Sequence, residues 1–350
     1  MAIPTTCKAA YLEKPGQIAF RKVKVPRPKP GEALVKIEAC GVCGSDVHYY
    51  AHGRIGDFVV RKPLILGHEC AGTVVAVGRR VENIQEGDRV AVEAGVTCGS
   101  CDHCRAGRYN LCPHVVFLAT PPVHGAFVQY LAHPASWLHR LPDAVSFEEG
   151  AMLEPFNVGL YAARLARVEP GASVAVLGSG PIGLTALQAA RALGAGTIIA
   201  TDVAPARLRL ARKLGAAHTI DARKHDPVQA ILDLTDGKGA DVVFEAAGTV
   251  GTTQQSVAVA RRGGAIALIG MGTQARFEMP VLDIIVKELR LTGQFRYANL
   301  YPPAIGLVAS GAVNLAAMVN SRYPFARVPE AMAACAKGDA KTIKTMIVDF

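Results

Sequence analysis

Residues 173–183 read Ser-Val-Ala-Val-Leu-Gly-Ser-Gly-Pro-Ile-Gly, an apolar run that leads directly into three glycines spaced Gly-x-Gly-x-x-Gly. The apolar run predicts a buried strand, and the Ala- and Leu-rich residues 182–193 predict a helix after it. In such a unit the first glycine permits a tight turn, the second lets the backbone approach a pyrophosphate, and the third lets helix and strand pack closely. The helix N-terminus then faces the phosphates. The stretch therefore predicts a dinucleotide-binding turn formed by Gly178, Gly180, Pro181, Ile182 and Gly183.

Asp202 closes the next predicted strand, about 20 residues beyond the glycines. A carboxylate at this place accepts hydrogen bonds from the ribose hydroxyls of adenosine and repels a 2′-phosphate, so the expected cofactor is NAD rather than NADP. Arg207, close by in the sequence, would temper that preference. The competing interpretation makes Asp202 the N-cap of the helix that starts at Pro205.

The chain changes in character after Glu148. Its earlier part carries short Val- and Ile-rich runs punctuated by glycine, as at 33–38, 72–77 and 88–92, which predict an irregular, largely antiparallel β domain. Later strand candidates alternate with helices, which is typical of a doubly wound parallel sheet. The strand candidates are 173–177, 197–201, 242–245, 265–269 and 289–292, and the helical stretches are 182–193, 205–214, 300–310 and 329–337. The predicted class is α/β.

The composition of the 350 residues excludes several classes of protein. Half of the residues are apolar, 19% are charged and the mean hydropathy is +0.24, which excludes a disordered chain, a coiled coil and a collagen. The length suggests two domains. The net charge of +9 comes mainly from scattered basic residues without interleaved aromatics, so no nucleic-acid partner is expected. Glycines and a proline interrupt the longest uncharged stretch, 173–190, so no membrane span is expected.

The N-terminal residues and the cysteines predict a cytoplasmic location. Residues 1–16 contain Lys and Glu where an apolar signal segment would lie. The nine cysteines are odd in number and mostly clustered, which favours metal ligation over disulfides in a chain of this kind.

The most specific local pattern is Cys98-x2-Cys101-x2-Cys104-x7-Cys112, called the four-cysteine lobe below. Four thiolates close a tetrahedral shell around zinc and leave no position for a substrate, so this zinc would be structural. An iron–sulfur cluster is the main alternative.

A second set of donors lies upstream. Cys40 and Cys43 precede the segment Gly67-His68-Glu69, and one thiolate, one imidazole and one carboxylate would form a zinc site with an open position. The residues alone do not choose between Cys40 and Cys43.

These motifs occur in one order, and that order resembles the zinc-dependent medium-chain alcohol dehydrogenase superfamily over essentially the whole chain. The sequence is most similar to the polyol dehydrogenases that act on sorbitol and xylitol. Segments 48–50, 53–56, 108–112, 119–122, 153–155 and 295–297 carry that similarity. Animal sorbitol dehydrogenases of this type lack a complete four-cysteine lobe, whereas this chain keeps it.

The resemblance implies a division of labour along the chain. A GroES-like catalytic domain would comprise 1–155 and 295–350, and a Rossmann domain 156–294 would bind NAD. Cys43, His68 and Glu69 would hold a catalytic zinc, and Glu154 would ligate it or hold its water. Ser45 and His48 would pass the proton out. The substrate would contact Tyr49, Glu154, Arg296 and Tyr297, and the cofactor would also contact Ile269, Gly270, Met271, Gln294, Phe295 and Arg296.

The implied reaction is reversible oxidation of a secondary hydroxyl of a polyol to a ketose, with two zinc ions per chain. A Lewis acid beside a hydride acceptor supports this chemistry. The family also implies a homo-oligomer, a tetramer. Alternatives are a 2,3-butanediol or L-threonine dehydrogenase and, more remotely, a non-catalytic regulator that binds zinc and NAD(H).

Overall fold

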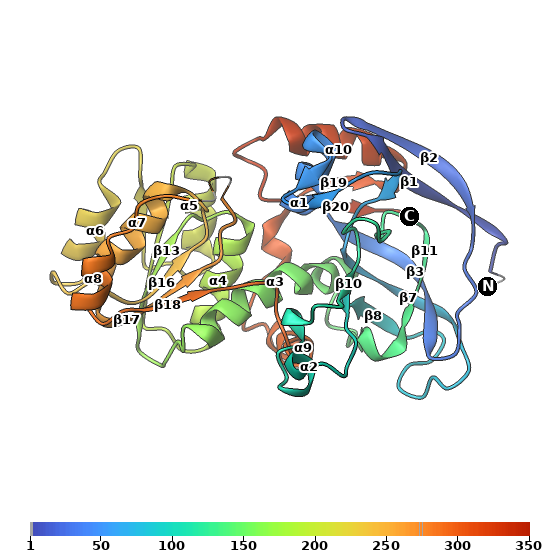
Figure 1. The fold of residues 1–350 in the computed structure, drawn as a ribbon, viewed down its shortest axis with the longest axis horizontal. Helices are drawn as coiled ribbons and strands as arrows, with labels where there is room; N and C mark the ends of the chain where they lie inside the picture. Colours follow the sequence, from blue (N-terminus) through green and yellow to red (C-terminus); the bar gives the residue numbers. More distant parts are fainter. Residues whose placement is uncertain (1–2, 273, 275) are drawn as a thin grey trace. The chain divides into compact units, whose positions relative to one another are not determined.

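The chain divides into two compact units in a computed structural model that describes residues 3–272, 274 and 276–350 (Figure 1). The first unit comprises Met1–Glu154, Tyr301–Ala309 and Leu315–Phe350, and the second comprises Pro155–Leu300 and Ser310–Asn314. The second unit therefore runs beyond residue 294, the end expected from the sequence, and it includes Phe295, Arg296 and Tyr297.

The first unit is built on a mainly antiparallel sheet, as predicted. The order in that sheet is β12 (Leu138–Arg140), β8 (Arg89–Val92), β7 (Glu69–Val77), β3 (Glu32–Gly41), β20 (Lys344–Val348) and β19 (Val319–Pro324), with β11 (Tyr130–Pro134) also paired to β3. Smaller sheets join β2 (Gln17–Lys24), β1 (Thr6–Lys14) and β6 (Leu64–Ile65), then β9 (Gly95–Val96) with β10 (Val116–Phe117), and β4 (Arg54–Ile55) with β5 (Phe58–Val59). The helices are α1 (Gly44–His52), α2 (Asp102–Arg105), α9 (Tyr301–Ala309) and α10 (Val328–Lys337), and α3 (Phe147–Leu165) continues into the second unit.

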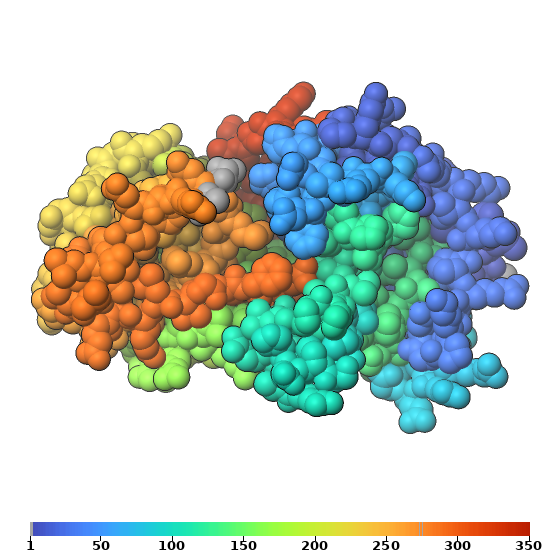
Figure 2. Space-filling view, viewed as in Figure 1, coloured from blue at the N-terminus to red at the C-terminus, as the bar shows by residue number. Residues whose placement is uncertain are grey.

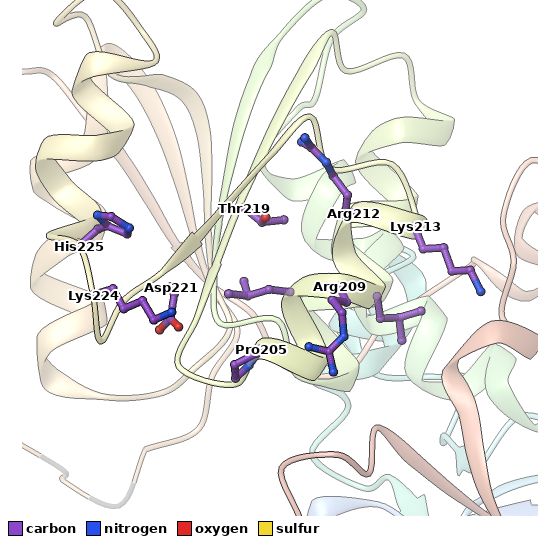
Figure 3. Close-up of a pocket in the computed structure, with 10 residues that line it drawn as sticks. Pro205, Arg209, Arg212, Lys213, Thr219, Asp221, Lys224 and His225 are labelled. Carbon is purple, nitrogen blue, oxygen red and sulfur yellow. The ribbon is translucent and has the colours of Figure 1, made fainter.

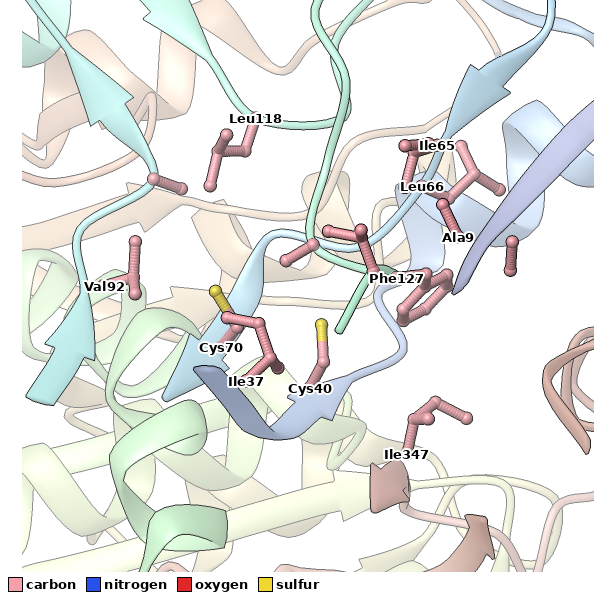
Figure 4. Close-up of a cluster of buried hydrophobic side chains, with 14 of the residues drawn as sticks. Ala9, Ile37, Cys40, Ile65, Leu66, Cys70, Val92, Leu118, Phe127 and Ile347 are labelled. Atoms are coloured by element: carbon pink, nitrogen blue, oxygen red, sulfur yellow. The ribbon is translucent and has the colours of Figure 1, made fainter. Parts of the chain in front are cut away.

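The core of the first unit forms around β3, β7 and β8, whose inward side chains are fully buried. Ile37, Cys40 and Phe127 lie together in this core (Figure 4). Cys40 is paired with Cys70 across β3 and β7, and burial raises the pKa of the Cys40 thiol well above its ordinary value. The packing fixes the register of these two strands, because a shift by one residue would turn each side chain to the other face.

The second unit is a doubly wound parallel sheet, which confirms the predicted fold class. Its order is β15 (His218–Asp221), β14 (Thr197–Asp202), β13 (Ser173–Leu177), β16 (Ala240–Glu245), β17 (Ala260–Leu268) and β18 (Arg290–Gly293). The helices are α4 (Pro181–Ala192), α5 (Pro205–Lys213), α6 (Pro227–Asp233), α7 (Val250–Val259) and α8 (Val281–Val286). Figure 1 shows α6, α7 and α8 on one face of the sheet and α4 and α5 on the other.

One strand begins earlier than the sequence indicates. The apolar run predicts a strand at 265–269, whereas β17 starts at Ala260 and continues through an irregular stretch of its pairing with β16. Residues 261–263 are Arg-Arg-Gly and exposed, so no apolar pattern marks this part of the strand. Within the described residues, each helix is too short or too polar to cross a bilayer.

The glycine at the start of α4 permits a backbone contact that can be tested by stability. A methyl group on Gly183 would overlap the carbonyl oxygen of Gly178, whereas a methyl group on the exposed Gly306 of α9 would meet open space. Gly183→Ala should lower the Tm by several degrees or prevent folding, because overpacking against backbone is costly. Gly306→Ala should leave the Tm unchanged or raise it, since alanine is more stable than glycine inside a helix by about 0.5–1 kcal/mol. Thermal melts of both variants decide, and equal melting temperatures would contradict the contact.

Candidate metal centres and nucleotide turn

Two antiparallel strands bring the donors of the upstream metal site together. The pairing of β3 with β7 sets Gly41 opposite Glu69, and Cys43 follows β3 as the N-cap of α1. His68 immediately precedes β7. The donor atoms of Cys43, His68 and Glu69 all lie within 4.8 Å of one another, and these residues are called the three-donor site below.

The structure resolves the choice that the residues alone leave open. The thiol of Cys40 is fully buried in the core and faces the carbonyl oxygen of Gly41 at 3.7 Å, so Cys43 and not Cys40 joins the donors. A Cβ at position 41 would overlap the carboxylate of Glu69, so a larger residue there would displace this donor.

Asp46 is a residue of this site that the sequence analysis did not single out. Its fully buried carboxylate accepts hydrogen bonds from the backbone amides of Cys43 (3.0 Å) and Gly67 (2.9 Å), and it lies 3.7 Å from Nδ1 of His68. Burial alone would raise the pKa of Asp46, but His68 and the two amides lower it. A carboxylate beside one ring nitrogen of a histidine orients the ring so that the other nitrogen faces a metal. In the sequence, the only indication of this role was the position of Asp46 three residues after the candidate ligand Cys43.

Lys344 is a second residue that the sequence analysis missed. It is 3% exposed on β20, and its ammonium group forms an ion pair with Glu69. Burial alone would lower the pKa of Lys344, but the charges of Glu69, Cys43 and Glu154 raise it. The strand reaches this place because β20 pairs with the end of β3. A lysine in the otherwise uncharged run 343–348 was the available signal.

The charges around His68 favour a bound cation. Burial alone would lower the pKa of His68, but Asp46 and Cys43 raise it well above the ordinary value. The same negative groups that hold a proton on this ring attract a metal ion to it. A thiolate, an imidazole and a carboxylate are zinc ligands, and three of them leave one position of a tetrahedron open. The three-donor site therefore fits a catalytic zinc.

The other predicted residues of the first unit lie on α1 and α3. Glu154 is 6% exposed and its charge acts on Lys344, but it is not one of the three grouped donors. Tyr49 is buried, whereas Ser45 is half-buried and His48 is exposed on the same helix. Ser45 and His48 are three residues apart, which places them on one face of α1. Their roles stay predictions.

The four-cysteine lobe has the dimensions of a single-metal site. The sulfur atoms of Cys98 and Cys104 are 3.9 Å apart, those of Cys101 and Cys104 3.5 Å, and those of Cys98 and Cys112 3.5 Å. A tetrahedron with metal–sulfur bonds of about 2.3 Å has edges of about 3.8 Å. A multi-iron cluster spreads its thiolates around several metal atoms and needs a wider set.

Backbone amides stabilise negative sulfur in the lobe. The pKa of Cys98 is lowered to about 5 because the amides of Ser100 and Cys101 point at its sulfur. The amide of His114 donates to the sulfur of Cys112 at 3.4 Å. Thiolate is the form that binds metal, so these contacts fit a structural zinc.

Tyr109 anchors the four-cysteine lobe to the sheet of the first unit. Its hydroxyl donates to the buried carboxylate of Glu93 at 2.7 Å, and the same carboxylate accepts from Nε2 of His139 at 2.8 Å. The Tyr109 ring packs edge-on against Trp137, and the His139 ring stacks on Tyr301. The lobe is therefore tied to the fold by a buried polar network as well as by its sulfurs.

The glycine turn after β13 has the geometry of the predicted dinucleotide motif. Gly178 has a φ of +94°, which favours glycine, and Gly183 touches the backbone of Gly178. Gly180 is the N-cap of α4. A Cβ added to Gly180 would meet only the guanidinium of Arg207, at 3.9 Å. Pro181 and Ile182 begin the helix. The turn thus leaves room for a phosphate next to a cation and free helix amides.

Asp202 ends β14, as expected, but its carboxylate also serves the fold. One oxygen accepts from the amide of Ser179 and the other from the amide of Ala204, each at 2.8 Å. Arg207 lies 3.7 Å away. Helix α5 begins at Pro205 with Ala204 as its N-cap, so Asp202 is not the helix cap of the competing interpretation. A carboxylate accepts more than two hydrogen bonds, which leaves capacity for ribose hydroxyls.

The remaining predicted cofactor and substrate residues lie after β17 and β18. Ile269 and Gly270 follow β17, and Met271 is 78% exposed. Gln294 donates to the carbonyl oxygen of Val158 at 2.6 Å. Phe295 is exposed beneath the guanidinium of Arg296, Arg296 has a φ of +55°, and Tyr297 is buried. All of these residues belong to the second unit, so their approach to the three-donor site stays a prediction.

A separate groove of about 880 Å³ lies along α5 and the end of β15 (Figure 3). Arg209, Arg212 and Lys213 line one side, and Lys224 and His225 line the other, near Asp221. It contains none of the residues predicted for the metal or nucleotide sites.

Comparison with known proteins gives two family matches and near-complete relatives. Residues 29–143 match the alcohol dehydrogenase GroES-like domain, and residues 181–310 match the zinc-binding dehydrogenase family. Sorbitol dehydrogenase of Bacillus subtilis (strain 168) is 46% identical over 345 residues, which is 99% of this chain and 98% of the relative.

Two solved structures extend the comparison. An Escherichia coli oxidoreductase of unknown specificity aligns with a TM-score of 0.94 at 40% identity, covering 98% of this chain and 99% of the other. The 2R,3R-butanediol dehydrogenase of Bacillus subtilis aligns with a TM-score of 0.90 at 31% identity, covering 98% and 99%. Together with the shared motifs, these findings identify the chain as a member of the zinc-dependent medium-chain alcohol dehydrogenase superfamily, in its polyol dehydrogenase family.

Proposed function

We propose that this enzyme oxidises a secondary hydroxyl of a polyol of the sorbitol or xylitol type to the ketose, with NAD as hydride acceptor. The observation that carries the proposal is the three-donor site, whose donors fit zinc and leave one position open. The relative named sorbitol dehydrogenase supports a polyol substrate. The structural likeness to a butanediol dehydrogenase makes 2,3-butanediol the second candidate.

Each residue of the site then has a task. Cys43, His68 and Glu69 would hold a zinc ion, which would act as a Lewis acid and lower the pKa of the reacting hydroxyl. Asp46 holds the ring of His68 in place, and Lys344 holds the carboxylate of Glu69.

Other side chains handle the proton and the substrate. Glu154 accepts the proton of the reacting hydroxyl, and Ser45 with the exposed His48 offers a second route to solvent. Tyr49, Arg296 and Tyr297 hydrogen-bond the neighbouring hydroxyls, which distinguishes a polyol from a simple alcohol.

The cofactor is NAD rather than NADP. Asp202 places a carboxylate where the adenosine ribose binds in this fold, and its negative charge disfavours a 2′-phosphate. Arg207, 3.7 Å from Asp202, reduces the repulsion of the 2′-phosphate without abolishing it. The turn 178–183 holds the pyrophosphate through backbone amides.

We further propose a homo-oligomer in which a second copy covers α8. Val281, Leu282, Ile285 and Val286 of this helix are 54–71% exposed, and α8 lies at the surface drawn in orange in Figure 2. The neighbouring β18 is an edge strand, which can pair with the same strand of another copy. The family resemblance supports the proposal of a tetramer, and the cysteines, which form no disulfide within the described residues, support the proposal of a cytoplasmic location, where thiols stay reduced.

The substrate class is tested by NADH formation. The chain should reduce NAD with sorbitol or xylitol at a higher kcat/KM than with 2,3-butanediol, L-threonine or 2-butanol. Arg296→Ala should reduce kcat/KM for the polyol about tenfold more than for 2-butanol, because 2-butanol lacks the extra hydroxyls. Highest activity on butanediol or threonine would overturn the polyol assignment. An equal loss of kcat/KM for the polyol and 2-butanol in Arg296→Ala would show that Arg296 serves the cofactor or the fold instead.

The two metal sites should be separable. His68→Ala should abolish turnover and lower the Tm less than Cys112→Ser does, because the amides of Cys43 and Gly67 still hydrogen-bond the carboxylate of Asp46. Cys112→Ser should lower the Tm while the folded fraction keeps appreciable turnover, because a closed site does not touch substrate. Metal analysis should give about two zinc ions per unmodified chain, since the sites share no ligand. One zinc per chain, with the thiols of the four-cysteine lobe free to react, would show that the lobe binds no metal.

The cofactor preference should depend on Asp202. NAD should be used at least tenfold more efficiently than NADP, a difference of about 1.4 kcal/mol. Asp202→Asn removes the charge but keeps one acceptor oxygen, which can still accept from the amide of Ser179 or of Ala204 but not from both. It should narrow the difference in efficiency between NAD and NADP mainly by improving NADP use. Steady-state kinetics with both cofactors measure this. Equal efficiency in the unmodified enzyme would show that the carboxylate does not select.

A further inference from the structure

Glu245 concentrates hydrogen bonds at the carboxyl end of β16. The residue is 1% exposed, and Oε1 of its side chain accepts from the amide of Ala247 (3.1 Å), the amide of Gly248 (2.8 Å) and the hydroxyl of Thr252 (2.8 Å). These donors belong to the turn 246–249 and to the first turn of α7. The side chain therefore fixes the turn that leaves β16.

The backbone of Glu245 fixes a second turn. Its carbonyl oxygen accepts from the amide of Ile269 at 2.8 Å and from the amide of Gly270 at 3.0 Å, directly after β17. Glu245 thus hydrogen-bonds the turns that follow two neighbouring strands, β16 and β17. Both turns lie at the carboxyl edge of the parallel sheet, where this fold binds its ligands.

The turn 246–249 packs closely on the glycine turn, and the turn 269–270 packs on the turn 246–249. A Cβ on Gly178 would lie 2.9 Å from the backbone nitrogen of Ala247, and a Cβ on Gly270 would overlap the backbone nitrogen of Gly248. Gly248 has a φ of +68°. The backbone and the small methyl group of Ala247 make the contact with Gly178, so the position of the turn 246–249 sets the space beside the pyrophosphate-binding turn.

None of these hydrogen-bond partners of the Glu245 carboxyl group is charged. Burial raises its pKa, and the hydroxyl of Thr252 and the amides of Gly248 and Ala247 lower it in part. The hydrogen bonds to a single oxygen do not require a charge, so the amide oxygen of glutamine can accept them as well.

We propose that Glu245 is a positioning residue for the nicotinamide dinucleotide: its side chain holds the turn 246–249 against the glycine turn, and its backbone holds the turn 269–270 against the turn 246–249. The inference rests on the proposed function, because it presumes that the dinucleotide binds at residues 178–183.

Asp241 provides a matched control on the same strand. It lies near the opposite end of β16 and accepts from the amide (2.8 Å) and hydroxyl (2.5 Å) of Ser173. Its loss removes the hydrogen bonds to Ser173 and an ion pair with Arg261 (2.6 Å), at the edge of the sheet away from the glycine turn. A merely structural effect should therefore appear in Asp241→Ala as much as in Glu245→Ala.

The experiment measures NADH affinity by fluorescence titration, amide hydrogen exchange without cofactor, and Tm. Glu245→Ala should raise the Kd for NADH at least tenfold and speed amide exchange at Ala247 and Gly248. Glu245→Gln should leave both the Kd and the exchange rates close to those of the unmodified chain. Asp241→Ala should lower the Tm but leave the Kd near that of the unmodified chain. Should Glu245→Ala fail to fold, Glu245→Asp, whose carboxylate is withdrawn from the amides by one methylene, is judged by the same criteria.

Two results would overturn the inference. One is unchanged NADH affinity in the folded Glu245 variant while the unmodified chain binds NADH. The other is an equal loss of affinity in the Asp241 variant, which would make the effect structural. If the unmodified chain binds neither NADH nor NADPH, the proposed function fails and the inference fails with it, so the two failures are distinguished by the unmodified chain alone.

Discussion

The antiparallel register of β3 and β7 is the constraint on which the metal chemistry of this chain depends. It sets Glu69 opposite Gly41 and places Cys43 at the start of α1, so that three donors from two segments of the chain lie within 4.8 Å of one another. The register is held by the buried side chains on either side of it, including the facing Cys40 and Cys70. The thiols in the core thus contribute to the site through packing, although they do not bind the metal.

Buried charges of opposite sign surround the three-donor site. Asp46 is fully buried and Lys344 nearly so, and each contacts a different donor, His68 and Glu69 respectively. Buried charges are tolerated only when they are paired, and removal of one partner costs about 3–5 kcal/mol. The two buried charges therefore fix the orientation of His68 and Glu69 at a cost in stability. In the second unit the carboxyl edge of the sheet is ordered differently, by backbone contacts between glycines and by the hydrogen bonds of Glu245.

Sequence patterns were sufficient where a motif is local. The strand–turn–helix unit around 173–193, the parallel sheet and the four-cysteine lobe were predicted from spacing alone, and the fold class is confirmed. The choice of Cys43 over Cys40 needed the resemblance or the structure, because both thiols precede the same helix. Lys344 was missed because it lies some 270 residues from Glu69 and reaches it only through the pairing of β20 with β3. Glu245 was missed for a different reason: its side-chain partners lie within seven residues of it, but hydrogen bonds to turn amides leave no pattern in the sequence.

The central claim is that the three-donor site keeps an open position at which a polyol hydroxyl binds, and cobalt(II) in place of zinc tests it most directly. The visible absorption bands of cobalt depend on the number and kind of its ligands. The account predicts that xylitol or sorbitol, added with NADH so that no net oxidation occurs, shifts these bands in the unmodified enzyme. The shift should persist in Cys112→Ser and should be absent from His68→Ala. Bands that do not respond to any polyol in an enzyme that oxidises it would contradict the account.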